Sequence, residues 1–258
     1  MLEPFADMIA ALRTMPLLEA VGWSFAGNIA MFIGALLLGN VLVRVYQQKA
    51  VSAPPEPITR LEIAYATICV ILNAFVAVAG IVLWRAGIIT VYFDLGWRVL
   101  LDVVVLIAAM DFAMYVFHRV AHIRWLYPLI HRTHHRFENP RPLTLFVLNP
   151  AETLGFGALL IVVVTLYPST WLGILLYLAF NLLFGLVGHL GVEPLPAAWL
   201  RIPLVKAIST STFHAEHHDD RFHNFGFYTV IWDRLFGTIS PDYERDFLRA
   251  NQPMERPG

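Results

Sequence analysis

The chain alternates long apolar runs with polar segments that are rich in histidine. Five runs carry almost no charge: 21–43, 61–84, 99–117, 151–167 and 170–188. About 20 apolar residues in a helix, at roughly 1.5 Å per residue, cross the hydrocarbon core of a bilayer. The last two runs meet at Tyr167-Pro168-Ser169, which predicts a tight helical hairpin. The pattern therefore predicts an all-α protein, an integral membrane helical bundle with four to five spans.

Short polar segments separate these runs. Residues 1–20 are mixed and slightly acidic, which indicates an interfacial helix, and Glu3 and Asp7 stand where a cleavable signal would be basic. The proline-rich sequence SAPPEP at 52–57 stops any helix that follows the first span. Residues 85–97 have the glycines and charges of a turn or surface segment. We expect residues 1–258 to form a single membrane-embedded domain.

The arginines predict the orientation of the bundle. The 118–150 segment carries five arginines against one glutamate, and the 44–60 loop is also basic. Basic loops stay in the cytoplasm. With five spans this rule places the N-terminus outside, Ser169 on the outer face, and the 193–258 segment inside. We therefore expect a cytoplasmic, helical, histidine-rich cap, built from residues 118–150 and 193–240.

The composition agrees with a membrane protein. Hydrophobic residues make up 58% of the chain and charged residues only 14%, whereas a soluble domain carries about a quarter charged residues. The mean hydropathy is +0.62. A formal net charge of −1 gives no reason to expect nucleic acid as a partner. The single cysteine, Cys69, excludes an intrachain disulfide and a four-thiolate iron–sulfur cluster.

The histidines are concentrated in the two parts of the cap. Nine of the ten lie there, in the sequences HRVAH, HRTHH, HAEHH and DDRFH, and none occurs in the first 117 residues. Spacings of three and four residues put side chains on one face of a helix. The candidate metal ligands are His118, His122, His131, His134, His135, His189, His214, His217, His218 and His223. Ten imidazoles exceed the needs of one ion, so two metal ions are the natural number.

The residues leave the metal open between iron and zinc. Imidazole suits both. The H-E-x-x-H sequence of zinc hydrolases is absent, since the second cap segment reads His-Ala-Glu-His-His, and so is the Glu-x-x-His of ferritin-like di-iron sites. A loosely chelating histidine tract would not follow the helical period. An all-imidazole site for two metals beside a membrane favours iron used for oxygen activation.

The motifs HRVAH, HRTHH and HAEHH, with the tail NFGFYTVIWDRLFGT, resemble the fatty acid hydroxylase/sterol desaturase superfamily over roughly residues 111–240. The resemblance implies a helical membrane anchor, a cytosolic histidine cap and a di-metal centre. Its histidine boxes carry over onto His118, His122, His131, His134, His135, His214, His217 and His218, with His189 and His223 as additional histidines. One sequence departs from the pattern: many members have His-Pro-x-x-Glu where this chain has Asn149-Pro150-Ala151-Glu152.

The resemblance also implies the activity, which is hydroxylation or desaturation of a lipid C–H bond with O2 and two Fe ions; Zn can occupy the site in a purified sample. Electrons must come from an external donor, a ferredoxin- or cytochrome-type reductase system, because no flavin or NAD fingerprint is visible. We expect the bacterial inner membrane, or otherwise the endoplasmic reticulum. A membrane zinc-dependent lipid hydrolase and a metal transporter or store are the alternatives, and the lipid stays open.

Carboxylates that orient the histidines are the catalytic candidates, Asp111 and Glu152. Asp111 lies inside an apolar run, where a charge is costly, seven residues before His118. We expect it to hold His118 in its metal-binding tautomer. Three further acidic residues near the histidines are Asp219, Asp220 and Asp233.

Two other polar features have structural interpretations. Trp232-Asp233-Arg234 is expected to lock the C-terminal part of the cap by packing and an ion pair. Asn181, two turns before His189, is expected to form a hydrogen bond between helices.

Overall fold

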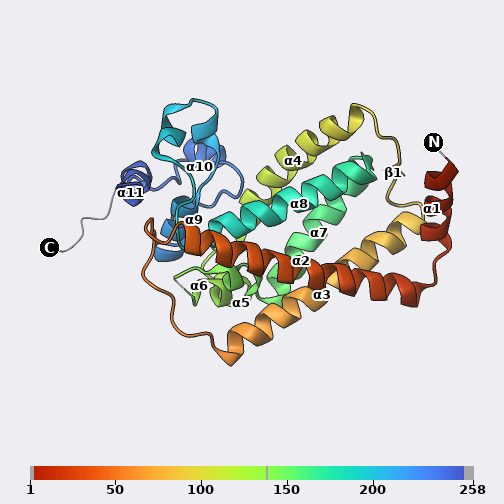
Figure 1. Ribbon diagram of the computed structural model, residues 1–258, viewed down its shortest axis with the longest axis horizontal. Coiled ribbons are helices and arrows are strands. Elements are labelled where there is room, and N and C mark those ends of the chain that lie inside the picture. The colour runs from red at the N-terminus through yellow and green to blue at the C-terminus, as the bar shows by residue number, and fades with distance from the viewer. Residues whose placement is uncertain (1–2, 138, 253–258) are drawn as a thin grey trace.

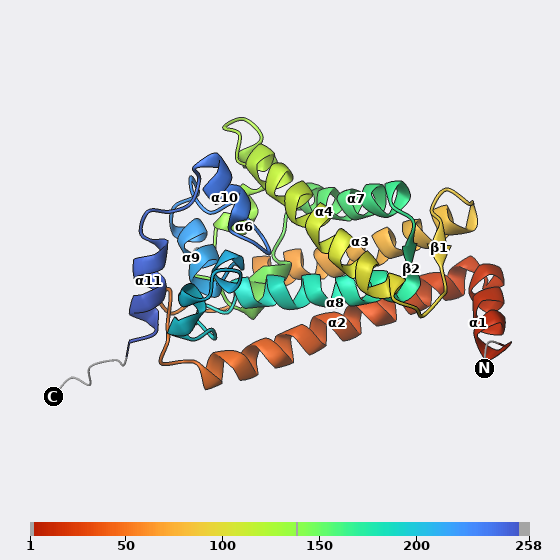
Figure 2. The same ribbon diagram turned by 90° about the horizontal axis from the view of Figure 1, so that it is seen from above.

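Five long apolar helices lie side by side along the length of the molecule (Figures 1 and 2). The computed structural model describes residues 3–137 and 139–252. The five helices are α2 (Leu17–Val45), α3 (Arg60–Arg85), α4 (Arg98–Ala121), α7 (Pro150–Leu166) and α8 (Trp171–Gly188). All but α7 are long and apolar enough to cross a membrane, and α7 has 17 residues. The prediction of an all-α, integral membrane helical bundle is confirmed.

Short elements gather at the two ends of this bundle. The N-terminal helix α1 (Glu3–Thr14) and the two-residue strand β1 lie at one end (Figures 1 and 2). The parts of the histidine-rich cap lie at the other. The short elements after α1 are β1 (Val91–Tyr92), α5 (Tyr127–Ile130), α6 (Arg132–His135), η1 (Pro142–Phe146), β2 (Ser169–Thr170), η2 (Ala197–Arg201), η3 (Val205–Ala207), α9 (Ser211–Asp219), α10 (Ile231–Phe236) and α11 (Tyr243–Ala250).

Local sequence explains where three of the long helices begin. Thr59 and Glu62 form a reciprocal capping box at the start of α3, which satisfies two backbone N–H groups that a helix otherwise leaves open. Asn149 caps α7 by accepting from the N–H of Ala151, and Pro150 fits the first helical position. Thr170 caps α8 in the same way. These caps end the polar segments and start the apolar ones at fixed residues.

Two buried carboxylates stabilise the bundle, one at each end. Glu62 of α3 pairs with the guanidinium of Arg141, which anchors the first part of the cap. Asp102 of α4 accepts from the hydroxyl of Tyr167 at 2.9 Å and from the N–H of Thr170 at 2.6 Å, at the opposite end. There β1 and β2 pair in parallel, so the turn of the α7–α8 hairpin is held against the start of α4.

The bundle and the cap have separate apolar cores. Leu106, Met110 and Met114 of α4 pack with residues of α7 and α8. In the cap, Phe213 of α9 packs against Val230 and against two aromatic residues of α11. The tail that connects these cores includes Tyr228, which is buried in the bundle core. The tail therefore attaches the cap to the bundle, because its residue Tyr228 packs inside the bundle core.

We expect the cap to face the cytoplasm, because the basic loops lie at its end of the bundle. Cysteines replacing Arg124 and Arg201, both exposed on the cap, should react with an impermeant thiol reagent only from the cytoplasmic side. A cysteine at Leu95, which is 64% exposed at the other end, should react only from outside. Ser169 is fully buried and is unsuitable. The wild-type chain, with buried Cys69, gives the background, and labelling of the cap from outside would contradict this topology.

Candidate metal centre

The structure brings nine of the ten histidines together at the cap end of the bundle, in two groups. Within each group, ligand nitrogens lie within 4.8 Å of one another. The first group is His118, His122, His131, His135 and His217. The second group is His134, His189, His214 and His218. Seven of these nine are almost completely buried, and the ligands come from the ends of α4 and α8 together with α6 and α9.

Each three-histidine motif divides its side chains between the groups. His131 and His135, four residues apart, enter the first group, whereas His134 enters the second. In α9 the assignment is reversed: His214 and His218 enter the second group and His217 the first. Adjacent helical residues point about 100° apart, and here His134 and His135 enter different groups. The motifs therefore link the two groups, because each motif contributes side chains to both.

Outward hydrogen bonds orient five of the imidazoles. The Nδ1 atoms of His118, His189 and His217 lie 2.8, 2.7 and 2.6 Å from backbone carbonyl oxygens of Phe225, Gly185 and His223. His134 Nδ1 approaches the Val147 carbonyl at 3.4 Å, and His131 Nδ1 contacts Glu152. A carbonyl oxygen accepts only, so each Nδ1 that faces one carries the proton. Their Nε2 atoms are left with lone pairs that face the interior of the groups.

These inward lone pairs face one another in pairs. The Nε2 atoms of His118 and His131 are 2.9 Å apart, and those of His134 and His189 are 3.2 Å apart. Two lone pairs at this distance repel unless a proton or cation lies between them. With bonds of about 2.1 Å, neighbouring ligand nitrogens on one ion lie about 3.0–3.4 Å apart. The donor set therefore fits bound metal ions.

A proton is a poor substitute for a metal there, because burial disfavours the imidazolium form. Burial lowers the pKa of His189 to about 4 and that of His217 to about 3. The pKa values of His131 and His134 lie well below the usual value, again through burial and then through neighbouring histidines. These histidines are neutral near pH 7, which is the form that binds metal.

Glu152 is the carboxylate that directly contacts a predicted ligand. Its Oε1 lies 2.6 Å from His131 Nδ1, and both residues are buried. Its Oε2 is also buried and has no hydrogen-bond partner among the described residues. A buried carboxylate needs compensating positive charge. A metal ion on His131 would supply it, so Glu152 fits the orienting role expected from the sequence.

Asp111 does not hold His118, and that expectation is wrong. Its oxygens accept instead from the backbone N–H groups of Tyr228 and Thr229, from the Thr229 hydroxyl at 2.5 Å and from Trp232 Nε1 at 3.0 Å. Seven residues of helix separate Asp111 from His118 by about 10 Å along the axis, and the cap tail fills the position between them. Asp111 therefore positions the tail and does not touch the imidazole.

The tail reaches His118 through Asp233. Asp233 accepts from the N–H groups of Phe225 and Gly226 at 2.8 and 2.7 Å, and so fixes the carbonyl that receives His118 Nδ1. Arg234 forms an ion pair with Glu244 on the surface. The Trp232-Asp233-Arg234 sequence locks the cap, as its pattern predicted. The carbonyl acceptors themselves were missed, because any residue type supplies a carbonyl and no sequence signal marks it.

Two candidate residues, His223 and Asp219, lie away from the two groups, and so does Asn149, where the family pattern has a histidine. His223 is outside both: its ring nitrogen contacts Asp220 at 2.9 Å, and only its carbonyl meets His217. We expected its imidazole among the ligands, and the structure does not bring it there. Asp219 is exposed, and Asn149 is the cap of α7.

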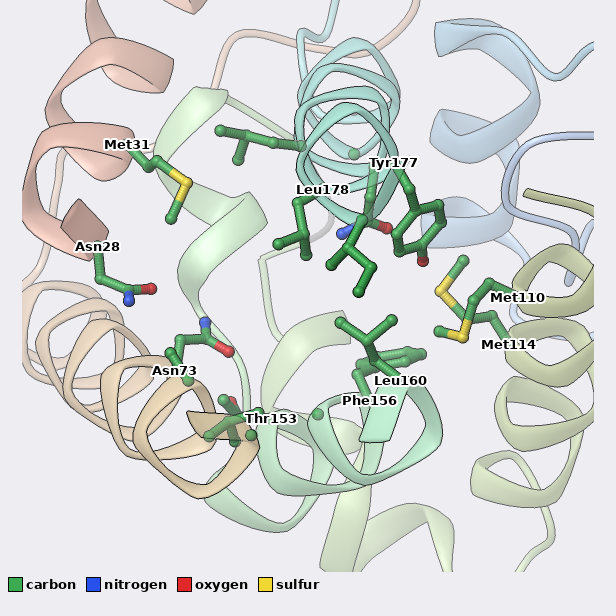
Figure 3. Close-up of a pocket in the computed structure, with 18 of the residues that line it drawn as sticks. Asn28, Met31, Asn73, Met110, Met114, Thr153, Phe156, Leu160, Tyr177 and Leu178 are labelled. Carbon is green, nitrogen blue, oxygen red and sulfur yellow. The ribbon is translucent and has the colours of Figure 1, made fainter. Parts of the chain in front are cut away.

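An apolar cavity of about 940 Å³ connects the histidines to the interior of the bundle. Figure 3 shows its wall, to which α2, α3, α4, α7 and α8 each contribute side chains. At the cap end it is lined by Glu152 and by histidines of both groups: His118, His131, His134, His189 and His214. A long hydrocarbon molecule in this cavity would meet both groups.

The fatty acid hydroxylase family model matches residues 103–238, just over half of the chain. This chain belongs to the fatty acid hydroxylase family. The matched region holds all nine grouped histidines and the cap tail, and the resemblance found in the motifs is thereby confirmed. Members of this family are membrane enzymes that hydroxylate or desaturate lipids. No solved structure matches the chain.

Several known proteins are similar to about half of this chain. The very-long-chain aldehyde decarbonylase GL1-11 of Oryza sativa subsp. indica is 30% identical over 57% of this chain and 54% of its own length. Methylsterol monooxygenase 2-2 of Arabidopsis thaliana is 28% identical over 57% and 55%. The cholesterol 25-hydroxylase-like protein of Danio rerio is 28% identical over 55% and 57%. The chain thus spans little more than half the length of these relatives.

Glu152→Gln should weaken metal binding without preventing folding. Gln keeps a hydrogen-bond acceptor for His131 but removes the charge, and loss of such an orienting partner typically costs 10–100-fold in affinity. Competition of the metal-loaded protein against a chelator measures it. Asp219→Asn, an exposed carboxylate away from the imidazoles, is the matched control. Unchanged metal affinity in Glu152→Gln would show that the charge of Glu152 does not support metal binding by His131.

Proposed function

We propose that this chain is a membrane di-iron oxygenase that hydroxylates or desaturates a C–H bond of a lipid, using O2 and electrons from an external donor. One ion would be held by the five-histidine group and one by the four-histidine group. The relatives named as a methylsterol monooxygenase and a cholesterol 25-hydroxylase-like protein support an oxidative reaction on a lipid.

The observation that carries the proposal is the meeting of the cavity with the histidines. The cavity holds about 940 Å³ and its wall is mostly apolar, including Met110, Met114 and Phe156. Such a cavity suits a hydrocarbon and excludes water. At its cap end the cavity is lined by imidazoles and by the carboxylate of Glu152. Ser209 also lines the cavity, and its hydroxyl donates to the carbonyl of Phe227. Oxidation of a C–H bond does not need a nucleophile of the kind that a hydrolase activates.

The number of ligands favours iron over zinc. Zinc in proteins is almost always bound by four ligands in structural sites, or by three ligands and water in catalytic ones. The first group has five imidazoles within reach of one point, which suits an ion of higher coordination number. Zinc is also redox-inactive, whereas the named oxygenase relatives carry out redox reactions. Zinc would still bind imidazoles in a purified sample.

The residues of this chain have three tasks in the reaction. The cavity wall holds the hydrocarbon beside the imidazoles and keeps water out. The carbonyls of Phe225 and Gly185, with Glu152, fix the tautomers of their histidines. When bound, iron supplies the activation of O2 and the one-electron chemistry that an unactivated C–H bond requires. Electrons would enter from the cap surface, from a ferredoxin- or cytochrome-type donor.

The position of the histidines favours an enzyme over a metal transporter. Transporter sites lie near the bilayer midplane on broken helices. Here the ligands lie at the C-terminal ends of α4 and α8 and in the cap, while both helices are continuous. We place the cap on the cytoplasmic face, in a bacterial inner membrane or otherwise in the endoplasmic reticulum, with residues 1–258 acting as one domain.

Lipids from cells that express the protein should contain a product whose formation needs O2. Growth under ¹⁸O2 should give either an alcohol that carries one ¹⁸O or an alkene that has lost two hydrogens, as read by mass spectrometry. Cells with His135→Ala should lack the product, because the first group loses a ligand. A product that forms without O2 and takes its oxygen from water would instead identify the zinc hydrolase.

Protein purified without chelators from iron-replete cells should contain two iron ions per chain. His135→Ala and His218→Ala remove one ligand each from the first and the second group, and each should lower the content toward one ion. His223→Ala is the matched control, since its ring lies outside both groups, and it should keep both ions. Elemental analysis measures the content. One ion per chain in a fully active protein would contradict the two-metal assignment.

A further inference from the structure

Two asparagines lie on the cavity wall at the middle of the membrane-spanning helices. Asn28 is eleven residues from the start of α2, and Asn73 is twelve residues from the end of α3, or about 16–18 Å of helix in each case. These depths are close to the centre of a bilayer core about 30 Å thick. Figure 3 shows both amides directed into the cavity, Asn28 beside Met31 and Asn73 near Thr153.

Both amides are only half satisfied. Asn28 Nδ2 donates to the carbonyl of Ser24 at 2.9 Å, and Asn73 Nδ2 lies 3.4 Å from the sulfur of Cys69, a weak acceptor. Neither Oδ1 has a hydrogen-bond partner in residues 3–137 or 139–252. The carbonyl of Ser24 fixes the orientation of the Asn28 amide, because a flipped amide would place two oxygens together. An acceptor oxygen of Asn28 therefore faces the cavity.

Other polar groups of the cavity satisfy one another. Tyr228 donates its hydroxyl to Asn181 Oδ1 at 2.6 Å, and the hydroxyl of Tyr177 lies 2.9 Å from that of Tyr228. This network joins α8 to the cap tail, not to another span as the sequence suggested for Asn181. Unsatisfied polar groups in a membrane interior are costly and usually functional. Asn28 and Asn73 differ from this network because no described residue donates a hydrogen bond to their Oδ1 atoms.

We infer that Asn28 and Asn73 bind the hydroxyl group of a neutral lipid alcohol inside the cavity, which rests on the proposed function for the identity of the cavity as a substrate site. A hydroxyl both donates and accepts. It can donate to Asn28 Oδ1 and pair with the weakly held amide of Asn73. A ketone or ester carbonyl cannot donate to Asn28, and a charged headgroup would be strongly disfavoured at this depth.

Asn73 lies beside the part of the cavity wall that leads to the histidines. Figure 3 shows Thr153 near Asn73, and the residue before Thr153, Glu152, contacts His131. A hydroxyl held at Asn73 would therefore leave the hydrocarbon part of the same molecule to extend toward the imidazoles. The asparagines would set which carbon of the lipid reaches the metal centre.

Binding of matched lipids to the metal-free protein tests the inference. The probes are cholesterol with its methyl ether and its ketone, and octadecan-1-ol with its methyl ether, each displacing a fluorescent apolar probe in detergent. The wild-type protein should bind an alcohol about tenfold more tightly than its ether, the usual effect of one buried hydrogen bond. The sterol and straight-chain arms show which kind of alcohol fits.

Variants separate recognition from helix packing. Asn28→Leu and Asn73→Leu should lower the alcohol-to-ether ratio to about one. Asn40→Leu is the matched control: Asn40 lies on the same helix, bonds to the carbonyl of Leu36 in the same way, and is exposed away from the cavity. Its ratio should equal that of the wild type.

Two results would overturn the inference. Equal binding of alcohol and ether by the wild-type protein would show that no hydroxyl is recognised, whether or not the variants fold. Lower thermal stability of Asn28→Leu and Asn73→Leu with an unchanged ratio would make the pair a contact between α2 and α3. Because the assay needs neither metal nor O2, hydroxyl recognition and oxygenase activity can fail separately.

Discussion

The packing of nine neutral imidazoles with their lone pairs directed inward is the constraint on which the rest of the structure depends. Such an arrangement is unfavourable by itself, because the Nε2 atoms of His118 and His131 approach to 2.9 Å and burial disfavours a proton between them. Five of the rings are held from outside, four by carbonyls of the chain and one by Glu152. Metal ions would convert this mutual repulsion into shared coordination.

The cap tail is the frame for this arrangement. Asp111 of α4 and Asp233, which belongs to the tail itself, both accept hydrogen bonds from backbone N–H groups of the tail. Carboxylates accept two to four hydrogen bonds each, and here they replace regular secondary structure, of which the tail has little. The carbonyl of Phe225 is thereby held against His118. Asp111 thus supports the position of His118 from within a membrane helix without touching the imidazole.

The helices of the bundle have two different faces. On α2 and α3 the outward residues, such as Ile33 and Phe75, are exposed apolar side chains suited to lipid. The inward residues include Asn28 of α2 and Asn73 of α3, which line the cavity together with Thr153 of α7. Because backbone groups are satisfied within each helix, the helices can separate enough to leave a cavity while they remain stable in lipid. The histidines close this cavity at the cap end.

The apolar runs and the histidine spacing, both visible in the sequence alone, determined the helices of the bundle and most of the histidine site. The five long helices begin and end within a few residues of the predicted ranges, since apolarity over 17 or more residues and cap residues such as Asn149 act locally. The motifs also indicated the family, and they contain eight of the nine histidines that meet; His189 lies outside them. These signals are short-range, and a single sequence contains them in full.

Only the tertiary structure decided which histidine belongs to which group and which partner each carboxylate contacts. The sequence could not separate His134 from His135, place His223 outside both groups, or show that Asp111 faces Tyr228 and Trp232 instead of His118. Each depends on where a segment more than a hundred residues away, or a neighbouring helix, presents its backbone. A carbonyl acceptor has no residue signature, and a cavity is the space left between helices. Both arise only when distant parts of the chain pack together.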